Sequence, residues 1–210
     1  MNKTFNKLII SPHADDEVLG CGGILDHHCF VYYCGLDESL VKPDPEHRIP
    51  LDEIFEEIEQ VSTFLGFKYE YNLETRVNYY REQELITSIE DLINKLKPEF
   101  IFLPQPGFNQ DHRTVFDASF IALRQHDENH FVNKVLVYEA VHDVLWNYRD
   151  CKPNYFVEIN IERKLRAYQL YKSQVRSFRS VEDLRNVAAI RGKMANCGHA
   201  EAFEILRWVE

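Results

Sequence analysis

A histidine and three consecutive acids stand directly after an apolar run near the start of the chain, in KLIISPHADDEVLGCGG (7–23). The carboxylates of Asp15, Asp16 and Glu17 repel one another, so an ordinary loop gains little from this arrangement, whereas a bound cation would offset the repulsion. His13 and Asp16 are three residues apart, which places them on one side of a tight turn or of a first helical turn. An imidazole and a carboxylate suit zinc, but two protein ligands leave a zinc site incomplete.

A second polar cluster is the best source of the third ligand. It follows the apolar run FIFLP (100–104) and consists of Asn109, Gln110, Asp111 and His112. A set of two histidines and one aspartate leaves one zinc position open for water, as in catalytic rather than structural zinc sites. Each cluster alone also has an ordinary explanation, because acidic residues favour helix N-termini and short dipeptides recur by chance.

Short apolar runs alternate with helical patterns, and this order predicts where the two clusters lie. Buried strands are expected at 7–11, 29–35, 100–104 and 135–141, and helices at 50–66 and 82–98. Such alternation predicts a mostly parallel sheet covered on both faces, in one domain over residues 1–210. Both clusters then lie at the C-terminal edge of the sheet, where open α/β sheets bind ligands. The segment 36–50, with three prolines, is expected to be a long loop at that edge.

Composition excludes several classes of protein. The chain has 210 residues and a net charge of −10, which argues against a general nucleic-acid binder that works through lysine and arginine. No run approaches the ~18 apolar residues of a membrane span, and the N-terminal apolar segment is too short for a signal peptide. The five cysteines form no CxxC pair and are expected to be reduced. A soluble, cytoplasmic protein is expected.

The chain resembles the PIG-L/LmbE-like zinc-dependent de-N-acetylases over nearly its whole length. PHADDEVLGCGG resembles the PHPDDE motif and its following glycines, with alanine for proline, and KPEFIFLPQPGFNQDHRTV resembles the second motif. KLRAYQLYKSQV and the closing RG…HAEAFEILR resemble the C-terminal segments. The resemblance implies a Rossmann-like three-layer sandwich with a mostly parallel sheet, one catalytic zinc ion, and hydrolysis of an N-acyl amide, usually on an amino sugar.

Carried over residue by residue, the resemblance makes His13, Asp16 and His112 the zinc ligands and Asp15 the general base. Zinc lowers the pKa of bound water towards ~7 and polarises the acyl carbonyl. Asp15 would take a proton from the attacking water and return it to the departing nitrogen. Similar ligand sets also accept iron, cobalt or manganese.

The sequence departs from the family pattern at two positions. The second motif often has a histidine three residues before the ligand, paired with an acid; here Asp111 is retained and Asn109 replaces the histidine. Asn109 cannot carry a proton, although its amide can donate a hydrogen bond to the oxyanion. An arginine that often binds substrate is replaced by Ile54, and Arg48 is a candidate substitute. His142, after the strand expected at 135–141, is a further candidate for substrate contact.

The function expected from the sequence is therefore removal of an N-acetyl group from a small molecule, most often an amino sugar or glycoconjugate. One alternative is an amidase acting on an antibiotic or thiol precursor. Another is a carbohydrate-binding protein with the same fold and weak or lost catalysis. The glycines in GCGG do not fit the GxGxxG spacing of dinucleotide-binding proteins. The oligomeric state, including a homo-oligomer, is left open.

Overall fold

The computed structural model describes residues 5–41, 44, 48–125, 127–146 and 152–210. Seven strands form one sheet in the order β3-β2-β1-β4-β5-β7-β6. Neighbouring strands are parallel except where β7 pairs with β5 and with β6. The strands are β1 (Lys7–Ser11), β2 (Cys29–Tyr33), β3 (Lys68–Tyr71), β4 (Phe100–Pro104), β5 (Lys134–Tyr138), β6 (Tyr155–Glu158) and β7 (Ala200–Trp208).

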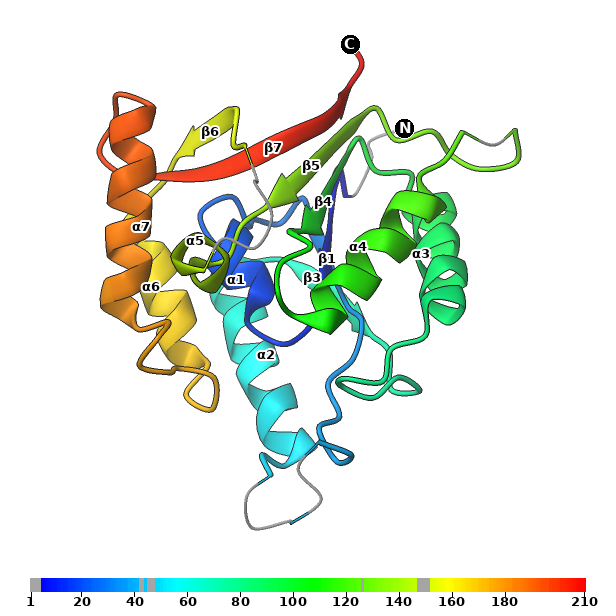
Figure 1. Cartoon of the computed structure of the whole chain (residues 1–210), viewed down its shortest axis with the longest axis horizontal. Coiled ribbons are helices and arrows are strands. Elements are labelled where there is room, and N and C mark those ends of the chain that lie inside the picture. The colour runs from blue at the N-terminus through cyan, green and yellow to red at the C-terminus, as the bar shows by residue number, and fades with distance from the viewer. Residues whose placement is uncertain (1–4, 42–43, 45–47, 126, 147–151) are drawn as a thin grey trace.

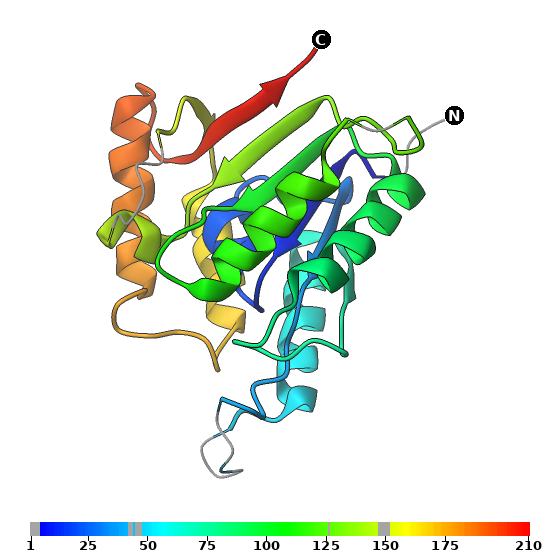
Figure 2. The ribbon, with the colours of Figure 1, turned by 45° about the vertical axis from the view of Figure 1, so that its right-hand side comes forward.

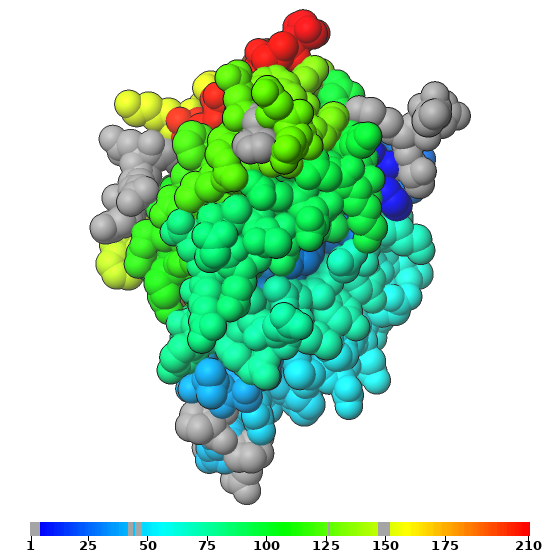
Figure 3. Space-filling model, turned by 90° about the vertical axis from the view of Figure 1, so that its right-hand side faces the viewer, coloured from blue at the N-terminus to red at the C-terminus, as the bar shows by residue number. Residues whose placement is uncertain are grey.

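Helices cover both faces of this sheet and complete a three-layer α/β sandwich (Figures 1 and 2). They are α1 (Asp16–Cys21), α2 (Leu51–Leu65), α3 (Glu82–Leu96), α4 (Gln110–Ala122), α5 (Val141–Leu145), α6 (Ile161–Leu170) and α7 (Val181–Met194). Helices α3 and α4 pack side by side on one face, and Figure 3 looks onto that side of the molecule. Helices α1, α2 and α6 lie on the other face, and α7 packs against α6 and β7.

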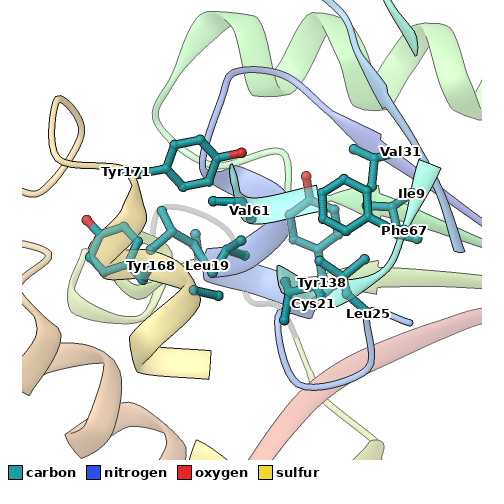
Figure 4. Close-up of a cluster of buried hydrophobic side chains, with 14 of the residues drawn as sticks. Ile9, Leu19, Cys21, Leu25, Val31, Val61, Phe67, Tyr138, Tyr168 and Tyr171 are labelled. Carbon is teal, nitrogen blue, oxygen red and sulfur yellow. The ribbon is translucent and has the colours of Figure 1, made fainter. Parts of the chain in front are cut away.

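Strand residues alternate between two apolar cores, as a sheet covered on both faces requires. In β1, Leu8 and Ile10 belong to the core under α3 and α4, whereas Ile9 belongs to the core under α1, α2 and α6. Figure 4 shows this second core, where Ile9 and Val31 lie near Phe67. The two cores cover both faces of the sheet and so set the position of its C-terminal edge.

Helix α1 approaches the sheet closely because Gly20 has no side chain. A Cβ atom at Gly20 would lie 2.1 Å from the ring of Tyr138 on β5. Tyr138 in turn donates from its hydroxyl to the carbonyl of Ile10 at 2.9 Å. The glycine of this motif therefore serves helix–sheet packing, which sets the position of the turn before α1.

The order of the strands places a topological switch between β1 and β4. From β1 the chain moves outward through β2 and β3, then returns to add β4 and β5 on the other side of β1. In open α/β sheets the loops diverge at such a point and leave room for a ligand at the C-terminal ends of the strands. The two polar clusters of the sequence follow β1 and β4.

The expected fold class is confirmed, with differences in detail. The strand expected at 135–141 ends at Tyr138, because Val141 already begins α5, and β3, β6 and β7 were not predicted. The seven strands of the described residues share one sheet, and one domain over residues 1–210 stays a prediction. Part of the predicted loop 36–50 lies outside the described residues.

Two expectations from composition can be compared with the described part of the chain. Its free cysteines are Cys21, Cys29 and Cys34, which are buried, and the partly exposed Cys197, whereas Cys151 lies outside it. Among the described residues, none of the helices has the length and apolar character needed to cross a membrane.

Candidate metal centre and active site

The β1–α1 junction carries the first cluster on an unusual backbone. Asp15 has φ 96° and ψ −26°, in the left-handed region that residues other than glycine seldom adopt. This conformation reverses the chain between the strand and α1. His13 lies before the reversal, and Asp16 begins the helix directly after it. The oxygen Oδ2 of Asp16 accepts from the backbone N–H of His13 at 3.1 Å.

Glu17 supports this turn from inside the protein. It is fully buried, and its Oε2 accepts from the backbone N–H of Asp15 at 3.2 Å and from the Ser11 hydroxyl at 3.4 Å. The Tyr171 hydroxyl, which follows α6, donates to Oε1 of Glu17 at 2.6 Å. Through these contacts Glu17 anchors the turn from inside the protein.

The β4–α4 junction carries the second cluster on an ordinary helix start. Asn109 is the N-cap of α4, with extended backbone, and its Oδ1 accepts from the N–H of Asp111 at 2.8 Å. Asp111 is buried, and its Oδ2 accepts from the backbone N–H of Asn78 at 2.8 Å. His112 follows in the first turn, and its side chain is about 2% exposed.

The two junctions bring two imidazoles to one carboxylate oxygen. Oδ2 of Asp16 lies 3.1 Å from Nδ1 of His13 and 3.2 Å from Nε2 of His112. The three residues each offer one ligand atom within 4.8 Å of the others, so the set is compact enough for a metal ion. Two imidazoles and a carboxylate also match the ligand types of zinc, and the residues present fit that ion.

Asp111 holds His13 from the side opposite Asp16. Its Oδ2 lies 2.9 Å from Nε2 of His13. A carboxylate on the far nitrogen of a metal-binding imidazole fixes the ring orientation and leaves the other nitrogen to the metal. This geometry assigns Asp111 to the positioning of His13.

The ionisation of His13 and of Asp16 follows from the contacts within this cluster. Burial opposes a charge on His13, but hydrogen bonds to Asp111 and Asp16 outweigh it and raise the pKa of His13 to about 10. Burial likewise disfavours a charged Asp16, yet the nearby His112 and His13 hold the pKa of Asp16 well below its usual range. A cation held by these residues would have to displace a proton from His13 and would meet an Asp16 carboxylate that is already ionised.

Asp15 faces a cavity of about 280 Å³ that opens beside these ligands. Burial raises the pKa of Asp15 well above its ordinary value, and the guanidinium of Arg179 opposes that rise. Nη1 of Arg179 lies 3.0 Å from Oδ2 of Asp15. His13, Asn109, His142 and Arg179 also line this cavity.

His142 reaches the same cavity from α5. Burial lowers the pKa of His142 to about 3, so the imidazole is neutral at neutral pH. Its ring centroid lies 5.4 Å from that of His112 and 5.7 Å from that of Phe108. Arg48, the other residue expected to bind substrate, lines a different cavity of about 490 Å³ with Asp37.

Three contributors to the site were missed at the sequence level. Arg179 lies between α6 and α7, and its sequence signal was only an arginine-containing loop beside a recognised motif. Asp143 directly follows the recognised His142, and its Oδ1 lies 3.8 Å from Nε2 of His142. Tyr171 stands inside the motif KLRAYQLYKSQV, but nothing in its spacing connects it to Glu17. All three act through contacts between residues that are distant in sequence or through burial.

Comparison with known families gives one match. The family model described as PIG-L: GlcNAc-PI de-N-acetylase matches residues 8–123, which is just over half of the chain. The search of curated proteins returns no match. The matched segment runs from β1 through α4 and includes both junctions.

Solved structures with low sequence identity share the fold. The N,N'-diacetylchitobiose deacetylase of Pyrococcus horikoshii is 21% identical, with a TM-score of 0.78 over 96% of this chain and 83% of that one. GalB, the 4-carboxy-2-hydroxymuconate hydratase of Pseudomonas putida KT2440, is 20% identical, with a TM-score of 0.78 over 98% and 99%. The A40926 pseudoaglycone deacetylase Dbv21 is 18% identical, with a TM-score of 0.75 over the full length of both chains. At these identities the likeness establishes the fold alone.

Proposed function

Since the chain belongs to the PIG-L family of GlcNAc-PI de-N-acetylases, we propose that it is a metal-dependent hydrolase that removes an N-acetyl group from an amino sugar or a related small glycoconjugate. The observation that carries this proposal is the convergence of His13 and His112 on Asp16, with Asp15 facing the adjoining cavity. His13, His112 and Asp16 would hold the ion, and Asp15 would move the proton.

Zinc, or a similar divalent ion held by His13, Asp16 and His112, would supply Lewis acidity and a water of lowered pKa. Asp16 is ionised beside the two imidazoles and provides the negative charge of the ligand set. Asp111 accepts a hydrogen bond from Nε2 of His13, and this contact keeps Nδ1 of the same ring turned towards Asp16. These contacts preorganise the ligand set before an ion binds.

Asp15 acts as the general base in this mechanism. It lines the cavity, and its burial raises the pKa of its carboxyl well above the ordinary value, which makes the carboxylate a stronger base. The ion pair with Arg179 keeps the carboxylate in place and limits that rise. Asp15 takes a proton from the attacking water and delivers it to the departing amine nitrogen.

Two neutral donors are available for the oxygen of the acyl group. His142 is uncharged at neutral pH and lines the cavity, so it can donate a hydrogen bond without carrying a proton away. Asn109 uses Oδ1 to cap α4, which leaves its Nδ2 group to donate. Donors that face developing negative charge stabilise the tetrahedral intermediate.

The rim of the cavity suits the apolar face of a sugar ring. Phe108 and Phe178 line it, and Phe108 stacks with Trp146 at 4.9 Å between ring centroids. Trp146 is 67% exposed, so its ring is available to a ligand. The volume of about 280 Å³ lies just below the usual range of ligand sites, about 300 to 1,000 Å³, and favours a single sugar unit.

Acetate release from a panel of N-acetylated sugars, measured with and without a chelator, tests the proposal. We expect release that stops on chelation and returns with zinc. The Asp15→Asn variant is the matched control, because it keeps the metal ligands and removes the base. Binding of the sugars without release of acetate by the metal-loaded wild type would favour the carbohydrate-binding alternative.

A further inference from the structure

His112 belongs to two groups of metal-ligand side chains. With His13 and Asp16 it forms the set described above, and with His142 and Asp143 it forms another. The ligand atoms of this second group also lie within 4.8 Å of one another, and all three residues are buried. The second group brings together α4 and α5, which follow β4 and β5.

The imidazole of His112 has one nitrogen without a partner. Nε2 lies 3.2 Å from Asp16, whereas Nδ1 is buried and has no hydrogen-bond partner within the described part of the chain. His112 as a whole is about 1% exposed. A buried ring nitrogen left unpaired is costly, and such groups commonly mark the place of an ion or a water.

The carboxylate of Asp143 is held in place for a ligand. Its Oδ2 accepts from the N–H of Ala140 at 3.0 Å, and its Oδ1 lies 3.8 Å from Nε2 of His142. A side chain at Gly107 would occupy this space, since a Cβ atom there would lie 2.4 Å from Oδ1 of Asp143. Glycine at 107 therefore leaves room for the carboxylate beside His142.

We propose that His112, His142 and Asp143 form a second divalent-cation position next to the first, with Nδ1 of His112 as its ligand, filled by zinc at higher free concentration. Because a neutral imidazole has a lone pair on one nitrogen only, His112 would bridge the two ions as an imidazolate, and the second ion would displace the remaining ring proton to solvent. The ligand types are the same as in the first set. Two ligands of one tetrahedral zinc ion lie about 3.3 Å apart, given bond lengths of about 2.0–2.1 Å. The 3.8 Å spacing here is wider than the 3.1 and 3.2 Å of the first set, so the second position binds more weakly.

An ion bound at this position would hold the imidazole of His142 as a ligand, so that it would no longer be available to a substrate in the cavity that it lines. Under the proposed function, on which this consequence rests, His142 donates to the acyl oxygen of the substrate. Excess zinc would then inhibit turnover. The binding of a second ion does not depend on that activity.

Equilibrium dialysis of metal-free protein against increasing zinc, with metal counted per chain, tests the position directly. We expect two ions per wild-type chain, bound in two steps. His142→Ala should keep the tight step and weaken the second by at least about 100-fold, because even partners outside the ligand shell contribute 10–100-fold. His13→Ala should lose the tight step and keep an ion at the weaker position, and His112→Ala should lose both.

Two controls separate this position from surface binding and from misfolding. His27 and His28 are exposed and adjacent, so their double alanine variant tests whether the second ion binds there. Asp143→Asn keeps an oxygen for the N–H of Ala140 but removes the charge, and it should also weaken the second step. Circular dichroism of each variant checks its folding.

The proposal is overturned if the wild type binds a single ion, or if His142→Ala and Asp143→Asn bind two ions like the wild type. Loss of the second ion in the His27/His28 variant would identify a surface site and would also overturn it. If the wild type deacetylates its substrate but binds only one ion, the proposed function stands and the second cation position is refuted. If it binds two ions as predicted but cleaves none of the substrates, the second cation position stands and the proposed function is refuted.

Discussion

The two strand–helix junctions of the site reach the same ion position by different backbones. At β1–α1 the chain passes through Asp15 at φ 96° with no side-chain cap, and the buried Glu17 accepts its N–H. At β4–α4 the chain is extended at Asn109, whose side chain caps the helix in the usual way. The first junction is strained and supported from inside, whereas the second is an ordinary helix start.

This difference indicates where the chemistry is concentrated. A residue other than glycine in the left-handed region costs roughly 1–3 kcal/mol and persists only where its surroundings impose it. The strained junction holds the carboxylate that faces the cavity, and the ordinary junction supplies His112. Of the two junctions, the one with a left-handed residue is therefore the one that carries the residue expected to move a proton.

The largest effect is expected from Asp15→Asn. The amide cannot accept a proton from water, so turnover should fall roughly 10²–10⁴-fold, the usual contribution of a general base. Zinc content should stay at the wild-type value, because Asp15 is outside the ligand set. Asp16→Asn, one residue later, should instead lose zinc, and equal zinc loss in both variants would contradict the separate roles.

Glu17→Gln tests the support beneath the strained junction through the pH dependence of stability. Burial raises the pKa of Glu17 from 4.5 to about 7, so the folded state holds this proton more tightly than the unfolded state. The stabilisation is full below pH 4.5 and is lost as the pH rises through about 7. The measurement is urea denaturation of metal-free protein at a series of pH values. We expect the difference in unfolding free energy between wild type and variant to change by about 3 kcal/mol across this pH range. A constant difference would contradict a buried, titrating Glu17.

The smallest effect is expected at the ordinary junction. Asn109→Ala should lower the free energy of unfolding by about 1 kcal/mol, the usual contribution of an N-cap. Asn160 is a matched control, because its Oδ1 caps α6 by accepting from the N–H of Arg163 at 3.1 Å. Asn160→Ala should lose similar stability and keep its turnover, while Asn109→Ala should also turn over more slowly. Unchanged turnover in Asn109→Ala would show that Asn109 caps α4 and takes no part in the reaction.

The same contrast shows how far the sequence could predict the molecule. Continuous apolar runs identified β1, β2, β4 and most of β5, and helical periodicity identified α2 and α3. The exposed residues of β3 lack such a run, and β6 and β7 depend on antiparallel pairing with distant strands. These pairings come from tertiary structure and leave little trace in local pattern.

Within the candidate site, residues that act through short spacing could be predicted and residues that act through the fold could not. That His13, Asp16 and His112 lie together could be predicted because two polar clusters end neighbouring strands. Arg179 reaches Asp15 only through the loop between α6 and α7. Burial, rather than residue type, lowers the pKa of His142 and keeps its imidazole neutral at neutral pH.

The central claim is that both junctions bind one ion together. The most direct test is the zinc content of His13→Ala and of His112→Ala, each dialysed against zinc limited by a competing chelator so that only the tight step fills. We predict one ion per wild-type chain and almost none in either variant. A His112→Ala protein that keeps as much tightly bound zinc as the wild type would contradict the account.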